Sequence, residues 1–466
     1  PFSLQESDPV ERLAGDLNVT NANILVVEER LVDLARQVTA ALGRPITLVG
    51  LDHASPGFLS LDAVAKRGTG GPSVEQLRAA IDPEDIATLI FTSGTTGEPK
   101  AVQLSHRAIV ISQFSTHKLA PFHQPGHEGV VLSYLPLNHI AERFMSHYAQ
   151  LTFGLAIHCV PNPDTLYDTI RKVRPTRFFG VPRVYEKLTN MARDLIEADP
   201  ALTAALAVNL RRVRAEQSGQ SPSAAEVAEA EAALASLARV RESLGLDRAE
   251  YVGVATAPSA YAMLEFLLAI GLRISDIWGL SEAIMCTLNP PNAIRLGTVG
   301  RFLDGVEGRI AEDGEILVRG PNVFSGYLND PEQTRQIWHD GWIHTGDVGS
   351  IEDGYLRILG RKKEMLITAT GKNIAPAVIE NALKSASPLI DYAVAIADNQ
   401  RYVTALVALD PQQLRAFTGR PEASFAELAA SPEVRQAIAD AVEAANRTLS
   451  RPESVRAFHI VDTPWT

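Results

Sequence analysis

The sequence runs Thr92-Ser93-Gly94-Thr95-Thr96-Gly97-Glu98-Pro99-Lys100 between two segments with the pattern of strands. The apolar run at 87–91 predicts a buried strand, and residues 101–106 predict a second extended segment. The two glycines between them let the backbone approach a ligand closely, and the N–H groups and hydroxyls together can surround an anion such as a triphosphate. The spacing of a Walker loop is absent. We therefore predict a phosphate-binding loop, the alternative being a hairpin turn rich in Ser, Thr and Gly that binds nothing.

Length and composition narrow the class of protein. A chain of 466 residues exceeds the usual single core, so at least two domains are expected. The net charge of −12 argues against a nucleic-acid-binding surface, which would be basic. The two cysteines, Cys159 and Cys286, exclude a disulfide framework, and their apolar surroundings predict inert, buried thiols in a cytoplasmic protein. No apolar run has the length of a membrane span, and no signal peptide is visible.

The order of helical and strand patterns predicts an α/β fold. Helices and strands alternate as far as Trp278, which indicates helix-covered parallel sheets. Residues 186–244 predict long surface helices, and the short glycine-spaced strands after Gly297 predict a small β-subdomain. The charged segment Arg361–Glu364 precedes a compact tail. We expect a large N-terminal domain over 1–360, which lacks its natural start because the chain begins with Pro1, and a small mobile α+β domain over 361–466.

Two further segments have residues suited to a nucleotide. Trp278-Gly279-Leu280-Ser281-Glu282 follows a predicted strand, where open α/β sheets place ligand contacts. Trp278 can stack on a purine and Glu282 can hold Mg²⁺, although a core tryptophan and a helix N-terminal acid explain both residues equally well. Asp347, which ends Trp342–Asp347, can accept the hydroxyls of a ribose, and Arg361 adds a cation. The alternatives are a turn aspartate and an exposed linker charge.

Two other features are weaker signals. Gly371-Lys372-Asn373 precedes a helix that contains Glu380, and its glycine permits a narrow ligand to pass, although a plain loop explains it almost as well. His139 ends a predicted strand and can either line a pocket or serve the structure alone.

Together these segments resemble the signature motifs of the adenylate-forming superfamily, in the same order along nearly the whole chain. Ser133–Glu142, Gly180–Leu188 and Gly371–Pro376 are most similar to long-chain fatty acyl-CoA synthetases of the bubblegum-type branch. The resemblance implies that a fatty carboxylate attacks the α-phosphate of ATP, and that coenzyme A then takes the acyl group and releases AMP. It also implies a role for His139 in the substrate pocket.

The resemblance assigns the remaining roles residue by residue. It places Thr92, Ser93, Gly94, Thr95, Thr96, Gly97 and Lys100 along the phosphates, with Thr95 and Glu282 at Mg²⁺. Thr256, Ala257, Trp278, Gly279 and Ser281 contact the nucleotide, and Asp347 and Arg361 bind its ribose. Lys363 is the hinge of the tail, and Gly371 and Lys372 line the route of the pantetheine.

Three departures leave alternatives open. Trp278 stands where tyrosine is usual, and Ala283 stands where threonine is frequent. The adenylation lysine of the family has no counterpart before Thr466, so we expect that the natural end is missing. A fatty acyl-AMP ligase that loads a carrier protein and a nucleotide-binding protein without catalysis remain alternatives. A homodimer and a peripheral membrane contact also stay open.

Overall fold

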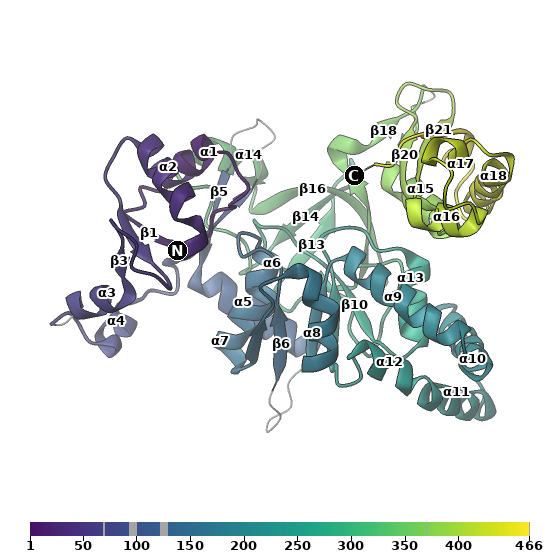
Figure 1. The fold of residues 1–466 in the computed structure, drawn as a ribbon, viewed down its shortest axis with the longest axis horizontal. Coiled ribbons are helices and arrows are strands. Elements are labelled where there is room, and N and C mark those ends of the chain that lie inside the picture. Colours follow the sequence, from purple (N-terminus) through teal and green to yellow (C-terminus); the bar gives the residue numbers. More distant parts are fainter. Residues whose placement is uncertain (69, 93–99, 122–128, 370, 466) are drawn as a thin grey trace.

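The structure is a computed structural model that describes residues 1–68, 70–92, 100–121, 129–369 and 371–465. Its first part is a small α/β unit, purple in Figure 1, in which three parallel strands adjoin two helices. The predicted alternation of helices and strands is confirmed in this part of the chain. The elements of this unit are α1 (Val10–Val19), β1 (Ile24–Val27), α2 (Val32–Leu42), β2 (Thr47–Gly50), β3 (Leu59–Ser60), α3 (Leu61–Arg67) and α4 (Val74–Ala80).

The large sheet of the chain has twelve strands, and five of them form its parallel part. Its parallel strands lie in the order β10-β9-β8-β6-β7, so strands far apart in sequence are neighbours. Because they are parallel, their carboxyl ends meet at one edge of the sheet, where such sheets place ligand contacts. The strands are β6 (Val130–Ser133), β7 (Ala156–Cys159), β8 (Arg177–Gly180), β9 (Tyr251–Val254) and β10 (Ile274–Trp278).

Helices cover both faces of this parallel part, which explains its nearly continuous apolar strands. In β8 the neighbours Phe178 and Phe179 point into different cores. Phe178 belongs to a core with residues of helices α8 to α13, and Phe179 belongs to a core with residues of α5 and of the π-helical turn at Arg143–Tyr148. The helices are α5 (His106–Leu119), α6 (Ile140–Glu142), α7 (Ala149–Phe153), α8 (Leu166–Val173), α9 (Pro182–Glu197), α10 (Pro200–Gln217), α11 (Ala224–Ser236), α12 (Ala238–Leu244) and α13 (Tyr261–Ala269).

The strands after Gly297 continue the same sheet. The two-residue strand β11 pairs antiparallel with β10, and the antiparallel order β11-β12-β17-β16-β14-β13 follows. The predicted β-subdomain is therefore present as strands, but it is joined edge to edge with the parallel part. Its elements are β11 (Thr287–Leu288), β12 (Arg301–Phe302), β13 (Glu307–Ile310), β14 (Glu315–Arg319), α14 (Pro331–Ile337), β15 (Trp338–His339), β16 (Trp342–Glu352) and β17 (Tyr355–Arg361).

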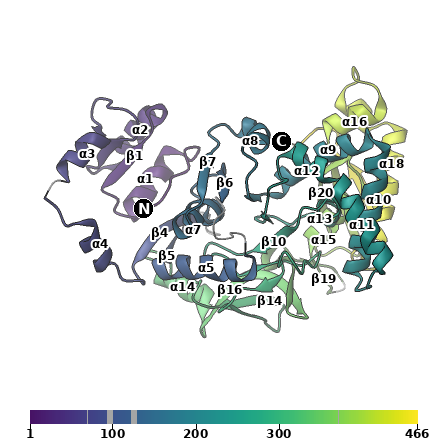
Figure 2. The same ribbon diagram turned by 90° about the horizontal axis from the view of Figure 1, so that it is seen from below.

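The tail has its own hydrophobic core and the predicted α+β composition. Figure 2 shows its helices at the opposite end of the molecule from the N-terminal unit. It touches the large sheet through α15, which packs against β17. The final strand β22, which runs parallel to β21, was not foreseen. The elements are β18 (Leu366–Ile367), β19 (Asn373–Ile374), α15 (Pro376–Ala386), β20 (Ile390–Ile396), β21 (Val403–Leu409), α16 (Pro411–Thr418), α17 (Phe425–Ala429), α18 (Pro432–Asn446) and β22 (Val455–Ile460).

The expectation for the cysteines was half wrong. Cys286 is fully buried, and burial raises the pKa of its thiol to about 12. Cys159 is exposed, because β7 is the edge strand of the large sheet and most of its residues face solvent. Within the described ranges, no helix is both long and apolar enough to cross a membrane.

Candidate active site

The predicted phosphate loop closes an antiparallel hairpin. Strands β4 (Ile86–Thr92) and β5 (Lys100–Ser105) pair in a separate two-stranded sheet, with Thr92 directly opposite Lys100. The predicted strands on both sides of the loop are thus confirmed. Ser93, Gly94, Thr95, Thr96 and Gly97 lie outside the described residues, so their roles stay predictions.

Glu282 and Lys100 meet at a residue that the sequence analysis missed. The hydroxyl of Tyr327 donates a hydrogen bond of 2.7 Å to Glu282 Oε1. The ammonium of Lys100 lies 5.1 Å from the centre of the Tyr327 ring, a cation–π contact. Burial and the nearby Glu282 carboxylate raise the pKa of Tyr327, so its phenol stays protonated and must be the donor. In the sequence, the only local feature that marks Tyr327 is the glycine before it, Gly326.

A tight turn holds the segment from Gly279 to Glu282. A Cβ on Gly279 would lie 2.1 Å from the carbonyl oxygen of Ile284, so only glycine fits this position. The N–H of Cys286 donates to the oxygen of Trp278 and thereby closes the turn. Ser281 and Glu282 are half-buried within it. The turn follows β10, as predicted.

Trp278, Asp347 and Arg361 form one cluster, although 69 residues separate the first two. The indole N–H of Trp278 donates to Asp347 Oδ2 at 2.9 Å, and Arg361 Nη1 lies 3.1 Å from Asp347 Oδ1. Asp347 pairs with Arg361 across β16 and β17. Burial raises the pKa of Asp347, while Arg361 and the indole oppose the rise. Trp278 is 8% exposed and also belongs to the hydrophobic core, so its predicted stacking on adenine stays a prediction.

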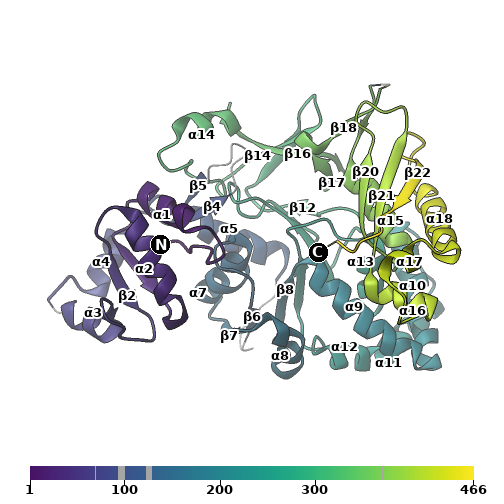
Figure 3. The ribbon, with the colours of Figure 1, turned by 45° about the horizontal axis from the view of Figure 1, so that its top comes forward.

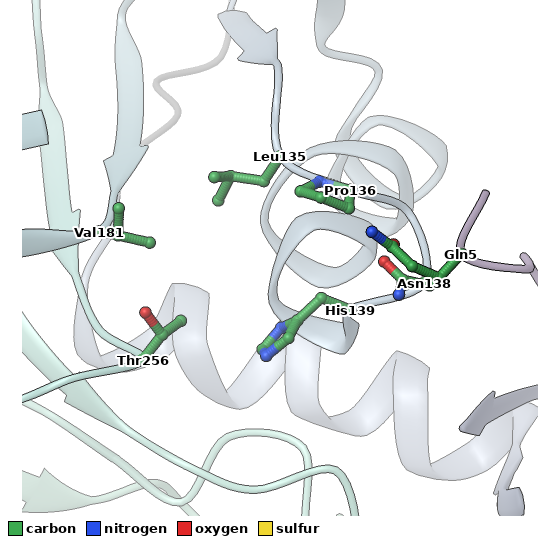
Figure 4. A pocket seen from close by; sticks show the side chains of 7 residues that line it. All are labelled: Gln5, Leu135, Pro136, Asn138, His139, Val181 and Thr256. Atoms are coloured by element: carbon green, nitrogen blue, oxygen red, sulfur yellow. The ribbon is translucent and has the colours of Figure 1, made fainter. Parts of the chain in front are cut away.

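His139 and Thr256 line one cavity with a volume of about 320 Å³. Figure 4 shows Gln5 and Asn138 on one side of it and Val181 and Thr256 opposite. Thr256 follows β9 with φ +78°, a left-handed conformation that residues other than glycine rarely adopt. His139 Nδ1 accepts a hydrogen bond from the N–H of Ala141, and partial burial of the ring in the cavity lowers its pKa. The imidazole is therefore neutral near pH 7, with its proton on Nε2.

Gln5 reaches this cavity through contacts that the sequence does not reveal. The backbone oxygen of Pro1 accepts hydrogen bonds from Leu89 N–H and the Thr88 hydroxyl, which attaches the first residues to β4. The buried guanidinium of Arg143 donates to Ser3 Oγ at 3.1 Å, to Thr88 Oγ1 and to the oxygen of Leu137. Arg143 thus links the first residues to the turn that carries His139.

At the start of the tail, Lys362, which precedes the predicted hinge residue Lys363, forms two ion pairs. Lys362 Nζ lies 2.6 Å from Asp313 and 2.8 Å from Glu315 Oε2. The same Glu315 oxygen lies 3.2 Å from His344 Nδ1. Lys363 is exposed, and in the described part of the chain no ion pair involves it.

Gly371, Lys372 and Ala257 are exposed, and Ala257 directly follows Thr256 of the cavity. Gly371 has φ +74° in the turn between β18 and β19, and no described atom lies within 4 Å of the Cβ position there. Among the described residues, no hydrogen bond or ion pair joins Lys372 to Trp278, Glu282 or Asp347. Figure 3 shows β18 beyond β17, at the start of the tail.

Known proteins share both the sequence pattern and the fold. The profile of AMP-binding enzymes matches residues 4–328, and that of the AMP-binding enzyme C-terminal domain matches residues 363–464. The protein fadD11 of Mycobacterium tuberculosis, provisionally named a fatty-acid–CoA ligase, is 41% identical over 88% of this chain and 74% of its own length. The long-chain-fatty-acid–CoA ligase ACSBG2 of Xenopus laevis is 34% identical over 75% of this chain, which spans about half (49%) of that protein. A crystal structure of an ATP-bound RpMatB–BxBclM chimera superimposes with a TM-score of 0.69 at 25% identity, over 99% of this chain and 80% of the other.

Proposed function

The chain belongs to the AMP-binding enzyme family, and on that premise we propose that it is an ATP-dependent long-chain fatty acid–CoA ligase. One observation carries the proposal. The residues predicted to bind the nucleotide lie in two clusters: Lys100 and Glu282 both contact Tyr327, and Asp347 contacts Trp278 and Arg361. The loops after β6, β8 and β9 enclose a cavity at the same edge of the sheet as Trp278. The relatives named fatty-acid–CoA ligases support the acyl substrate.

The first step of the proposed reaction makes a mixed anhydride. A carboxylate oxygen of the fatty acid bonds to the α-phosphorus of ATP, and the bond from that phosphorus to the bridging oxygen breaks to release pyrophosphate. Lys100 and the loop before it meet the phosphate charge. Asp347 has lone pairs left after its bonds to Trp278 and Arg361, and these can accept the ribose hydroxyls.

The chain has a suitable ligand for Mg²⁺ at Glu282. Oε1 of this carboxylate accepts from Tyr327, while no hydrogen bond or ion pair joins Oε2 to another described residue. Carboxylate oxygens are the ligands that Mg²⁺ prefers beside substrate phosphates. When bound, the ion would neutralise charge on the phosphate oxygens. Glu282, with Thr95 from the undescribed loop, would hold it.

The second step transfers the acyl group to coenzyme A. The thiol sulfur bonds to the acyl carbon, the bond from that carbon to the AMP oxygen breaks, and the thiol proton is released. We assign Lys363 as the hinge about which the tail changes position, with Gly371 and Lys372 along the pantetheine. The ion pairs of Lys362 with β14 and the turn before it hold the residue next to this hinge on the large sheet.

The test is release of pyrophosphate from ATP and Mg²⁺ with palmitate and with shorter and longer acids. Hydroxylamine, which traps an acyl-adenylate as hydroxamate, is added with and without coenzyme A. We expect hydroxamate without coenzyme A and acyl-CoA with it. Hydroxamate without any thioester would favour a carrier-protein acceptor, and no pyrophosphate would favour a protein without catalysis.

The variant for this assay is Glu282→Ala. Loss of a preorganised charge contact at transferring phosphates commonly costs 10²–10³ in rate, so pyrophosphate release should fall about 100-fold in a protein that is still folded. Glu312→Ala, which removes an exposed carboxylate of the large sheet outside both clusters, is the control. Unchanged turnover of Glu282→Ala would remove Glu282 from this role.

A further inference from the structure

The segment that carries Tyr327 is attached along strand β5. Ser325 N–H donates to the oxygen of Gln103 at 2.8 Å, and Gln103 N–H donates to the oxygen of Gly326 at 3.1 Å. Leu328 N–H donates to the oxygen of Ala101 at 2.9 Å. Tyr327 is therefore fixed beside the strand that begins at Lys100, directly after the predicted phosphate loop.

The same segment holds Glu282 at two points. The N–H of Phe324 donates to the backbone oxygen of Glu282 at 2.8 Å, and the Tyr327 hydroxyl donates to its carboxylate. Phe324 also packs edge-on against the Tyr327 ring, with centroids 5.1 Å apart. Tyr327 is 6% exposed, so its ring has little freedom to turn away.

We propose that Tyr327 is a positioning residue of the ATP site, which orients the Glu282 carboxylate for a divalent cation and couples it to Lys100. The inference rests on the proposed function, because it concerns the cation that accompanies ATP. A neutral phenol is well suited to this task, since it occupies one lone pair of the carboxylate without cancelling its charge. An arginine or lysine in its place would neutralise the ligand.

The size of the effect follows from similar arrangements elsewhere. Groups that hydrogen-bond a metal ligand typically contribute 10–100-fold to metal affinity. Tyr327→Phe removes only the hydroxyl and keeps the ring beneath Lys100, so the fold and the cation–π contact should survive. The matched control is Tyr355→Phe, because Tyr355, in β17 of the large sheet, is also buried and donates its hydroxyl to a backbone oxygen, that of Ala293.

The experiment measures binding, without turnover. Affinity for a non-hydrolysable ATP analogue is determined by calorimetry over a range of free Mg²⁺ concentrations, with Tm as a check on folding. We expect Tyr327→Phe to need at least tenfold more Mg²⁺ for half-maximal tightening, and Tyr355→Phe to match the wild type. In a Glu282→Gln background, Tyr327→Phe should have less than a twofold further effect.

The outcomes separate the two proposals. A wild type that binds the nucleotide with a Mg²⁺ dependence that Tyr327→Phe leaves unchanged would overturn the inference alone. Equal losses from Tyr327→Phe in the wild-type and Glu282→Gln backgrounds would overturn it too, because Tyr327 would then act independently of Glu282. A wild type without nucleotide binding would reject the proposed function, and the inference with it.

Discussion

Replacing Asp347 with asparagine isolates the ribose contact that we propose. The substitution keeps the shape of the side chain, and its Oδ1 can still accept from the Trp278 indole. It removes the charge that faces Arg361. Because Arg361 is largely exposed, loss of this ion pair costs less than about 1 kcal/mol. Burial raises the pKa of Asp347, so a neutral side chain also removes a desolvation cost, and we expect almost no change in Tm.

The expected effect on the nucleotide is much larger. Each hydrogen bond to a charged group contributes about 1.5–3 kcal/mol, and a ribose offers two hydroxyls. Arg361 already neutralises part of the charge, so we take the lower limit for both, about 3 kcal/mol. That corresponds to a loss of roughly 150-fold in kcat/KM for ATP.

The assay compares ATP with 2′,3′-dideoxy-ATP in fatty-acid-dependent pyrophosphate release. The wild type should lose roughly 150-fold on the dideoxy nucleotide, and Asp347→Asn should lose less than about threefold further, because the same contacts are already gone. Asp353→Asn is the control, since Asp353 follows the same strand and pairs with Arg295 at the surface. A penalty for dideoxy-ATP that is as large in Asp347→Asn as in the wild type would refute the ribose assignment.

Two further predictions concern the hinge and the N-terminal unit. Lys362→Met removes two ion pairs, one to the buried Glu315, and should speed hydrogen exchange of amides 363–367 about fivefold; unchanged exchange would show that these pairs do not fix the start of the tail. Burial raises the pKa of Asp16 from 3.8 to about 6, so its ionised form costs stability above that pH and costs nothing below the unfolded pKa. Asp16→Asn should therefore raise the Tm by roughly 2–4 °C at pH 8 and change it little at pH 4. Equal shifts at both values of pH would contradict this assignment.

Local patterns were sufficient to predict most of the elements and the order of the motifs. The hairpin around the phosphate loop and the turn after β10 follow from apolar runs interrupted by glycine, and both are found. The same patterns could not show that the β-rich part joins the parallel sheet, because the linking strands β11 and β12 are only two residues long. Cys159 was misplaced since its strand pattern does not reveal an uncovered edge.

The missed site residues share a physical cause. Tyr327 bonds to Glu282, 45 positions earlier, and Gln5 reaches a cavity formed by residues more than a hundred positions away. Such contacts depend on tertiary packing and leave no periodic signal in one sequence. Asp347 could be predicted as a ribose ligand from its place at a strand end, with Arg361 as a cation for the same nucleotide; the contact of Asp347 with Trp278 could not, because 69 positions separate the two residues.

The most direct single measurement is a crystal structure of the protein with a sulfamate analogue of palmitoyl-AMP. We expect the ribose within hydrogen-bonding distance of Asp347, the sulfamate on the side of Lys100 and Glu282, and the alkyl chain entering the cavity lined by Leu135 and His139. An analogue bound away from Asp347 and Lys100, or with its alkyl chain outside that cavity, would contradict the proposed activation of a fatty acid at this site.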